Sequence, residues 1–371
     1  GRLFPDAGTD TALRPYSDDK GLKKVRPLFM HFFRVEDTIK AVQSAGRGRN
    51  RERIRVSSTK KMFSKRRLKL ADINRSALEN PEAFIEEENQ RYSDGVEGLA
   101  RALAVGLRDR CLVMLSGPSS SGKTTTAVLL TEELRELGLD AHKVSLDDFY
   151  CGRGRAPRLE DGSYDYEALE ALDLPRLQRC MRQLLEEGRT RLPIFDFMKG
   201  RPAEETRLLE TGHDSVVIFE GIHALNPVFE EHLPAENLYK VFINTLSPIY
   251  DEGEKLLARR ELVRRLLRDE RFRNSPVEET LAMWPQVTRG ENLYMFPYVD
   301  TVDTVLDTTH AYEPCVFAAE LLPLLEAVPA DSPFAQRAES LAAALRRFQP
   351  LPPERVPQRS LLREFLGGGV V

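Results

Sequence analysis

Short apolar runs alternate with longer stretches of mixed polarity in the middle of the chain, and this alternation predicts the fold. The runs have the length and composition of buried strands and lie at residues 111–115, 142–146, 216–219, 239–245 and 304–306. Between them, helical spacing of apolar residues covers 124–137, 166–187, 254–272 and 312–326. Strands separated by helices favour parallel pairing with right-handed crossovers. We therefore predict an α/β domain over residues 106–330, a parallel sheet flanked by helices.

Three further segments flank this domain. Residues 70–105 have broadly helical spacing and predict a helical connector. Residues 331–371 predict one amphipathic helix followed by a proline-rich tail. Residues 1–69 are rich in Arg, Lys, Gly and Ser and contain too few apolar residues for a core. We interpret them as a basic, poorly defined segment, either an accessory or a truncated domain.

The charge of the chain is divided unevenly between these segments. The formal net charge is −4, but residues 1–69 hold 19 Lys and Arg against 7 Asp and Glu, a net +12. The remaining 35 basic and 51 acidic residues leave −16 on residues 70–371. The basic segment raises the hypothesis that it binds RNA. It carries no RNA-binding motif and few aromatic residues, so nucleic acid is not the partner that the sequence favours.

Composition excludes several classes of protein. Hydrophobic residues make up 41% and charged residues 30%, which predicts a soluble chain with a sizeable core. No apolar run approaches the roughly 18 residues of a membrane-spanning helix, so no membrane partner is expected. The four cysteines lie far apart without a C-x-x-C pair, which favours reduced thiols in a cytoplasmic protein over a zinc site or disulfide framework. The oligomeric state stays open, a homo-oligomer included.

The strongest chemical signal is a glycine-rich stretch directly after the first apolar run. It matches G-x-x-x-x-G-K-[ST] and opens a helix, as a phosphate-binding loop does. The glycines let backbone N–H groups turn toward phosphate oxygens, and the helix N-terminus adds positive potential. We expect Lys123 to reach the β- and γ-phosphates of ATP and the Thr124 hydroxyl to ligate Mg²⁺. The predicted nucleotide-binding residues are Gly117, Pro118, Ser119, Ser120, Ser121, Gly122, Lys123, Thr124 and Thr125.

Acidic residues follow two further predicted strands, at the edge where a parallel sheet opens its ligand crevice. Asp147 and Asp148 are adjacent there, and two such acids favour a bound cation or a shared proton. Asp147 is predicted to accept the proton of an attacking hydroxyl. Asp148 is left between such a role and capping the next turn. Glu220 directly follows the apolar run 216–219 and is predicted to hold Mg²⁺, directly or through water.

Arginines are concentrated between residues 259 and 273. Arg264 and Arg268 lie on one helical face, and Arg265 and Arg268 are three residues apart. Such a helix is either a solvated charged surface, with acids such as Asp269 as partners, or a lid. In a lid, mobile guanidinium groups neutralise the charge that develops on a transferred phosphoryl group. Because the helix follows a phosphate-binding loop, we favour the lid.

In this order, these landmarks resemble the uridine kinase / phosphoribulokinase family of P-loop kinases. The resemblance covers residues 106–330 and rests on G-P-S-S-S-G-K-T-T, S-L-D-D-F-Y, Y-D-Y-E-A-L, I-F-D-F, F-E-G-I-H-A-L-N-P and R-R-L-L-R-D-E-R-F-R. More narrowly, M-W-P, R-G-E and L-R-E-F-L-G-G resemble a bacterial-type uridine kinase-like group. That group often carries an N-terminal domain related to threonyl-tRNA synthetase. The resemblance implies a P-loop NTPase-type fold with an arginine-rich helical lid and a small hairpin over the substrate.

The resemblance also implies roles for individual residues. Catalysis is implied for Asp147 as the base, with Lys123, Arg265 and Arg268 stabilising charge. The implied metal ligands are Thr124, Glu220 and Asp147, and the implied substrate-binding residues are Asp165, Phe195, Arg265, Arg268 and Arg273. Uridine-cytidine kinases have a histidine after the aromatic-Asp-Phe stretch, where this chain has Met198-Lys-Gly-Arg201.

The sequence therefore predicts an ATP- and Mg²⁺-dependent, uridine kinase-like phosphotransferase. Its acceptor is expected to be a hydroxyl of a nucleoside or a similar small molecule. Two alternatives stay open. One is a kinase of a non-nucleoside sugar or polyol, and the other is a catalytically weak ATP-binding regulatory module of the same fold.

Overall fold

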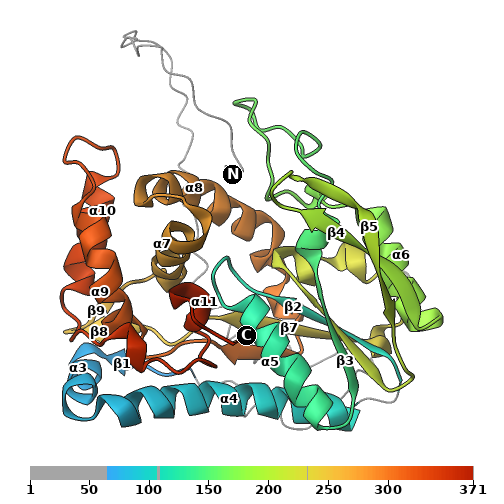
Figure 1. The fold of residues 1–371 in the computed structure, drawn as a ribbon, viewed down its shortest axis with the longest axis horizontal. Coiled ribbons are helices and arrows are strands. Elements are labelled where there is room, and N and C mark those ends of the chain that lie inside the picture. Colours follow the sequence, from blue (N-terminus) through green and yellow to red (C-terminus); the bar gives the residue numbers. More distant parts are fainter. Residues whose placement is uncertain (1–64, 107–108, 232, 371) are drawn as a thin grey trace, which may run out of the picture.

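The computed structural model describes residues 65–106, 109–231 and 233–370. Within them, five strands form a parallel sheet with the order β10-β7-β2-β6-β3 (Figure 1). They are β2 (Cys111–Ser116), β3 (Asp140–Ser145), β6 (Ser215–Glu220), β7 (Leu238–Asn244) and β10 (Thr304–Asp307). Each overlaps one of the predicted apolar runs, so the predicted α/β class is confirmed. Residues 1–64 of the basic segment lie outside the described residues. The hypothesis that this segment binds RNA therefore concerns a part of the chain that the structure does not describe.

Both faces of the sheet are covered, which is why its strands read as continuous apolar runs. Alternate residues of β2 face opposite sides: Val113 and Leu115 join one core, and Leu112 and Met114 join the other. Helices α4 (Pro81–Gly106), α5 (Lys123–Glu136) and α9 (Glu313–Glu326) contribute to the first core, and α6 (Leu174–Glu186) contributes to the second. Burial of each large aliphatic side chain stabilises the fold by about 1.5–3 kcal/mol.

Two predicted helices begin later than their apolar spacing suggested. The helix predicted over 166–187 is α6, which starts at Leu174. The reason is local, because the Asp173 side chain caps it by accepting from the Arg176 N–H at 3.1 Å, with a proline in the first turn. The helix predicted over 254–272 is α7 (Arg260–Arg273).

In the described part of the chain, a small second sheet has three strands, two of which directly precede α7 in the sequence. There β8 (Ile249–Asp251) and β9 (Glu254–Leu256) form an antiparallel pair, and β1 (Leu68–Lys69) joins β8 in parallel. Helix α8 (Val277–Tyr294) follows α7 and packs against it.

The segments before and after the predicted domain pack into the same apolar core as the sheet. Helices α3 (Leu70–Glu79), α10 (Ala335–Leu345) and α11 (Arg363–Leu366) all contribute side chains to it. Leu361 and Phe365 in the tail are fully buried. Figure 1 shows α4 running along one side of the sheet and α11 close to the start of α5. No helix in the described ranges is long and apolar enough to cross a membrane.

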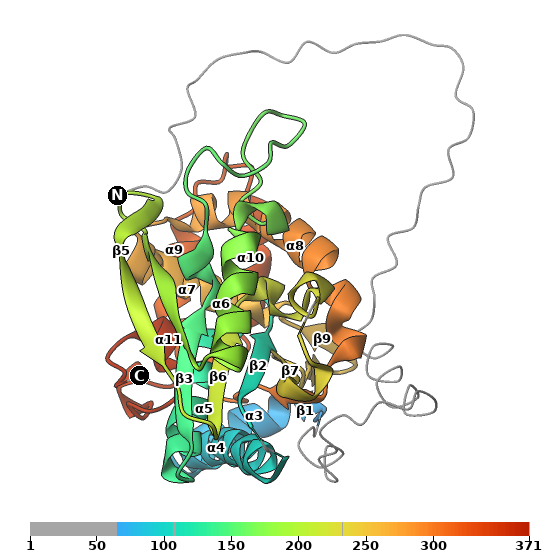
Figure 2. The same ribbon diagram turned by 90° about the vertical axis from the view of Figure 1, so that its right-hand side faces the viewer.

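A two-stranded antiparallel hairpin stands beside the parallel sheet (Figure 2). It consists of β4 (Arg189–Asp196) and β5 (Arg201–Glu210). This hairpin contains the aromatic-Asp-Phe stretch and contacts the short turn after β3. The fold therefore brings the predicted phosphate-binding loop, the acids after β3 and β6, helix α7 and the hairpin to the carboxyl edge of one sheet.

Candidate active site

A loop of residues 117–122 joins β2 to α5 and has no room for side chains at its two glycines. A Cβ on Gly117 would collide with a main-chain carbonyl oxygen of β7. Gly122 has φ +93°, and a Cβ there would lie 2.5 Å from Leu361 Cδ1. Ser120 also takes a positive φ, 61°, which costs energy for a residue with a side chain. These glycines permit a tight turn in which the backbone itself borders the cleft.

Helix α5 begins at Lys123, directly after this turn. The first N–H groups of a helix have no partner within it and attract anions. The first one to bond back along the helix is that of Thr126, to the Gly122 carbonyl oxygen at 2.9 Å. Lys123 Nζ donates to the carbonyl oxygens of Gly117 and Pro118 at 3.0 and 2.9 Å. Burial lowers the pKa of Lys123, while the acids around it act in the opposite direction.

Two acids from neighbouring strands meet at the first turn of α5. Glu220 ends β6, and its Oε1 lies 3.4 Å from Thr124 Oγ1. Asp147 follows β3, whose last residue, Ser145, is the register partner of Glu220. Asp147 is exposed to the open cleft, yet the protein around it desolvates the carboxylate and raises its pKa. Desolvation, and then the charge of Asp147, likewise raises the pKa of Glu220.

This group of oxygens fits a magnesium ion. Mg²⁺ prefers oxygen ligands, and proteins usually hold it with one or two carboxylates plus substrate phosphates. Thr124, Glu220 and Asp147 supply a hydroxyl and two carboxylates whose mutual repulsion a cation would relieve. Within the described residues, no group of three or more His, Cys, Asp or Glu forms a site built from protein ligands alone.

Helix α7 brings three predicted arginines to the cleft, and one buried acid holds them together. Asp269 lies 3.1 Å from Arg265, 2.8 Å from Arg268 and 3.5 Å from Arg273. Arg265 Nη1 also donates to Ser119 Oγ at 2.8 Å, which ties the helix to the phosphate-binding loop. Burial, then the charge of Arg268, lowers the pKa of Arg273 to about 10. We call Arg265, Arg268 and Arg273 the lid arginines.

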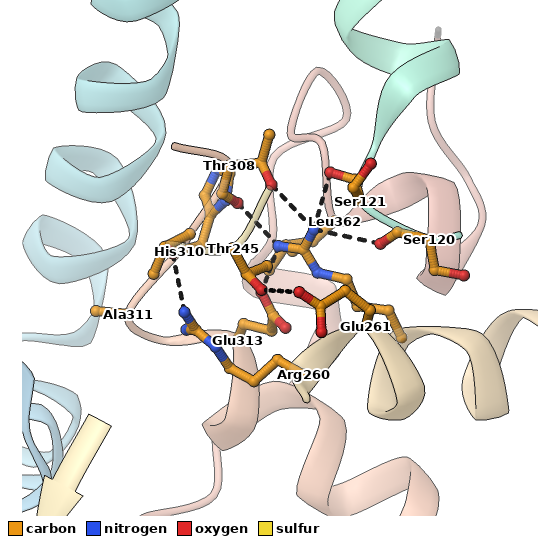
Figure 3. A network of polar contacts seen from close by, with 12 residues as sticks. Ser120, Ser121, Thr245, Arg260, Glu261, Thr308, His310, Ala311, Glu313 and Leu362 are labelled. Atoms are coloured by element: carbon orange, nitrogen blue, oxygen red, sulfur yellow. Dashed lines mark hydrogen bonds and ion pairs between the residues drawn. The ribbon is translucent and has the colours of Figure 1, made fainter. Parts of the chain in front are cut away.

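Arg264 does not belong with the lid arginines, although the helical pattern put it on one face with Arg268. It is fully buried and pairs with Glu313, Nη2 to Oε2, at 2.6 Å. It also donates to the main-chain carbonyl oxygens of Thr308 at 2.8 Å and Ser121 at 3.2 Å. Figure 3 shows this network between the loop and the start of α9. Arg264 therefore anchors α7 from inside the core, although it lies one helical turn from Arg268.

The hairpin side of the cleft is aromatic. Phe195 packs edge-on against Tyr150, with ring centroids 5.9 Å apart, and against Phe197 at 5.0 Å. Asp165, which the resemblance assigned to the substrate, is buried and pairs with Arg289 of α8 at 2.7 Å. It is not among the residues that border the cleft.

One cavity of about 680 Å³ joins these parts. Eleven of the predicted site residues border it: Ser119, Ser120, Gly122, Lys123, Thr124, Asp147, Phe195, Glu220, Arg265, Arg268 and Arg273. The other five do not: Gly117, Pro118, Ser121, Thr125 and Asp165. The predicted residues are separated widely along the chain, so their convergence on one cavity is a property of the fold.

Comparison with known proteins shows the family of the chain. A sequence model of the phosphoribulokinase / uridine kinase family matches residues 112–311, which are 200 of the 371 residues. The chain belongs to this family. It is therefore a kinase whose phosphoryl acceptor is a hydroxyl group. The N-terminal domain implied by the narrower resemblance falls outside the described residues.

The curated relatives match just under half of this kinase, and a solved structure matches somewhat more than half. A uridine kinase from Lactobacillus johnsonii is 28% identical over 172 residues, 46% of this chain and 72% of that protein. A uridine kinase from Mycoplasma genitalium is 29% identical over 177 residues, 47% of this chain and 74% of that protein. A solved structure described as a possible uridine kinase from Bacillus stearothermophilus covers 58% of this chain and 98% of its own, with 18% identity and a TM-score of 0.41.

Four carboxylates of this kinase's site were given no site role by the sequence analysis. Asp269 was weighed only as a surface partner. Glu167 borders the cleft, and desolvation raises its pKa to about 7 against the effect of Arg265. Glu291 and Glu364 lie in R-G-E and L-R-E-F-L-G-G, two stretches that carried the narrower resemblance without an assigned role. Those two stretches were the sequence signal from which Glu291 and Glu364 could have been predicted as site residues.

Glu291 contacts the phosphate-binding loop from α8. Its Oε1 accepts from the Ser119 N–H at 2.9 Å, and its Oε2 accepts from Arg259 at 2.6 Å. Burial raises the pKa of Glu291, and the Arg259 charge opposes that effect. The loop of this kinase is thus fixed from both α7 and α8.

Proposed function

We propose that this kinase transfers the γ-phosphoryl group of ATP to a hydroxyl of a nucleoside or a similar small molecule. The observation that carries the proposal is the single cavity bordered by the loop, Asp147, Glu220 and the lid arginines. Phosphoryl transfer depends on positioning the phosphates and on neutralising their charge. The cavity contains groups suited to both tasks.

Each group has a step to perform. The N–H groups of the loop and Lys123 would bind the phosphates. Asp147 would take the proton of the acceptor hydroxyl while the hydroxyl oxygen forms a bond to the γ-phosphorus. The bond between the γ-phosphorus and the oxygen that bridges it to the β-phosphate would break, and ADP would leave. The lid arginines would stabilise charge on the transferred group.

Thr124, Glu220 and Asp147 would hold Mg²⁺ at the same edge. When bound, the ion would supply positive charge that offsets the negative charge of the ATP phosphates. Glu220 lies at a buried strand end, Thr124 in the first turn of α5 and Asp147 in the turn directly after β3, so the sheet positions all three.

Aromatic and thioether side chains support an acceptor with a flat apolar part. Tyr150, Phe195, Phe197, Met198 and Met283 all border the cavity. Such side chains recognise rings by stacking and edge contacts. A nucleoside base fits this lining better than a polyol does.

A specific observation favours the second candidate, a kinase of a sugar or polyol. Asp165 is the acid that the resemblance assigned to the ribose hydroxyls. Here its carboxylate is buried and already paired with Arg289. An acid held in this way has less capacity to accept hydrogen bonds from a ribose diol, which favours an acceptor without one.

The test is an ADP-release screen over nucleosides, sugars, polyols and amino acids, with the wild type and Asp147→Asn. We expect one acceptor class to stimulate ADP release and Asp147→Asn to lower kcat about 10²–10⁴-fold, the usual contribution of a general base. Asp214→Asn is the control, because Asp214 is exposed and precedes β6 at the opposite edge of the sheet. Full turnover by Asp147→Asn would show that Asp147 is not the general base. ATP binding without phosphorylation of any acceptor would indicate the regulatory module.

A further inference from the structure

The tail of the chain covers the start of helix α5. Leu361 packs against Gly122, and Leu361, Leu362 and Phe365 are fully buried. Helix α11 contacts α7 on one side and reaches the first turn of α5 on the other (Figure 1). A segment 239 residues away in sequence therefore borders the phosphate-binding loop.

From this tail, Glu364 places a carboxylate on the donors of Thr125. Its Oε2 accepts from Thr125 Oγ1 at 2.6 Å and from the Thr125 N–H at 3.4 Å. That N–H is one of the first-turn donors of α5 that have no partner within the helix. The same carboxylate borders the cavity and acts electrostatically on Lys123. An anion thus already stands where the helix start attracts one.

This placement differs from that of the other carboxylate on the loop. Glu291 is neutralised by its ion pair with Arg259 and belongs to the 18-residue helix α8. Glu364 belongs to a four-residue helix, and its charge acts on Lys123 and Arg264 without a direct ion pair among the described residues. Its charge is therefore left facing the loop, and a phosphate oxygen that used the Thr125 donors would meet it directly.

We propose that Glu364 is a determinant of nucleotide affinity that competes with a phosphate group of ATP for the Thr125 donors. The inference rests on the proposed binding of ATP by the loop. Binding then requires the Glu364 carboxylate to withdraw from Thr125, so nucleotide affinity and the position of the tail are linked. A ligand without a phosphate group does not bind these donors, so its affinity does not depend on the charge of Glu364.

A helix cap is the competing explanation, because carboxylates stabilise helix N-termini. The two explanations predict opposite results for the charge-neutral variant. Loss of a cap lowers thermal stability and brings no gain in affinity. Loss of the competing charge leaves only a neutral amide oxygen near the Thr125 donors, so nucleotide binding strengthens even if thermal stability falls slightly.

The experiment measures the Kd of MgATP and of adenosine by calorimetry, on the full chain, for the wild type, Glu364→Gln and Glu354→Gln. Glu354→Gln is the matched control, since it removes the same charge from an exposed position of the same tail. We expect Glu364→Gln to bind ATP about tenfold more tightly, equivalent to about 1.4 kcal/mol. Adenosine affinity should stay unchanged, and Glu354→Gln should match the wild type for both ligands. Glu364→Ala is a second variant in case Glu364→Gln folds poorly. The melting temperature of every variant shows whether it is folded.

Three results would overturn the inference. The first is ATP affinity equal to or below that of the wild type in both Glu364 variants. The second is an equal gain for adenosine, which would indicate a loosened tail instead of a removed charge. The third is the same gain in Glu354→Gln, which would indicate a long-range charge effect. If the wild type phosphorylates an acceptor while these results hold, only the inference fails. If neither wild type nor variant binds ATP, the proposed function fails as well.

Discussion

The buried ion pair between Arg264 and Glu313 offers a quantitative test of how α7 is anchored. Both side chains are buried, at 0% and 1% exposure, and their atoms Nη2 and Oε2 lie 2.6 Å apart. Glu313→Gln keeps the shape and a hydrogen-bonding oxygen but removes the negative charge. The guanidinium of Arg264 would retain the carbonyl oxygens of Thr308 and Ser121 and lose its counter-ion.

The expected cost follows from the burial. Removing one partner of a buried ion pair leaves an uncompensated charge and typically costs 3–5 kcal/mol. Arg264 keeps two carbonyl contacts, so we expect a loss of about 3 kcal/mol in the free energy of unfolding, the lower end of that range. An exposed pair in the same chain sets the baseline. Arg346 and Glu326 are 43% and 49% exposed at 2.9 Å, and Glu326→Gln should cost less than about 1 kcal/mol.

Urea unfolding followed by circular dichroism measures both variants against the wild type. The reasoning fails if Glu313→Gln loses no more stability than Glu326→Gln. It also fails if the Glu313 variant keeps its stability but loses only nucleotide binding, since Arg264 would then act on the ligand instead of the core.

Two further predictions concern the cleft. Asp269→Asn removes the acid that holds the three lid arginines, so we expect kcat to fall at least about tenfold in ADP release, with Glu270→Gln, one residue along α7, as the control. Unchanged kcat in the Asp269 variant would mean that the lid arginines are positioned without Asp269. Glu167 has its pKa raised to about 7, so the folded protein binds a proton there that the unfolded chain has lost. Its contribution to stability is therefore full below about pH 4.5 and lost as the pH rises through about 7. Glu167→Gln should make the fall in unfolding free energy over that window shallower, and an unchanged slope in urea titrations at several pH values would contradict the shift.

The elements of the sheet could be predicted because their signals are local. A strand that is covered on both faces must be apolar along its whole length, and this pattern is visible in Cys111–Ser116 without knowledge of its neighbours. The phosphate-binding loop is local in the same sense, since its two glycines and Lys123 act within one turn. The start of α6 was missed because a cap and a proline outweighed an apolar spacing that continues past them.

Tertiary contact decided which charged residues belong to the cleft. Arg264 and Arg265 are adjacent in sequence, yet one is anchored in the core by Glu313 and the other donates to Ser119 in the loop. Helical periodicity fixes directions around one axis, and it does not state which neighbours lie in those directions.

The sequence by itself determined the parallel α/β sheet and the kinase family of the chain, and it predicted that the loop after β2 binds phosphate. Only the tertiary structure decided that Glu291 and Glu364, 172 and 239 residues from their partners, place carboxylates on that loop. The physical reason is range. Apolar period and loop chemistry act over a few residues, whereas the charge around a buried donor is set by whatever segment the fold packs against it.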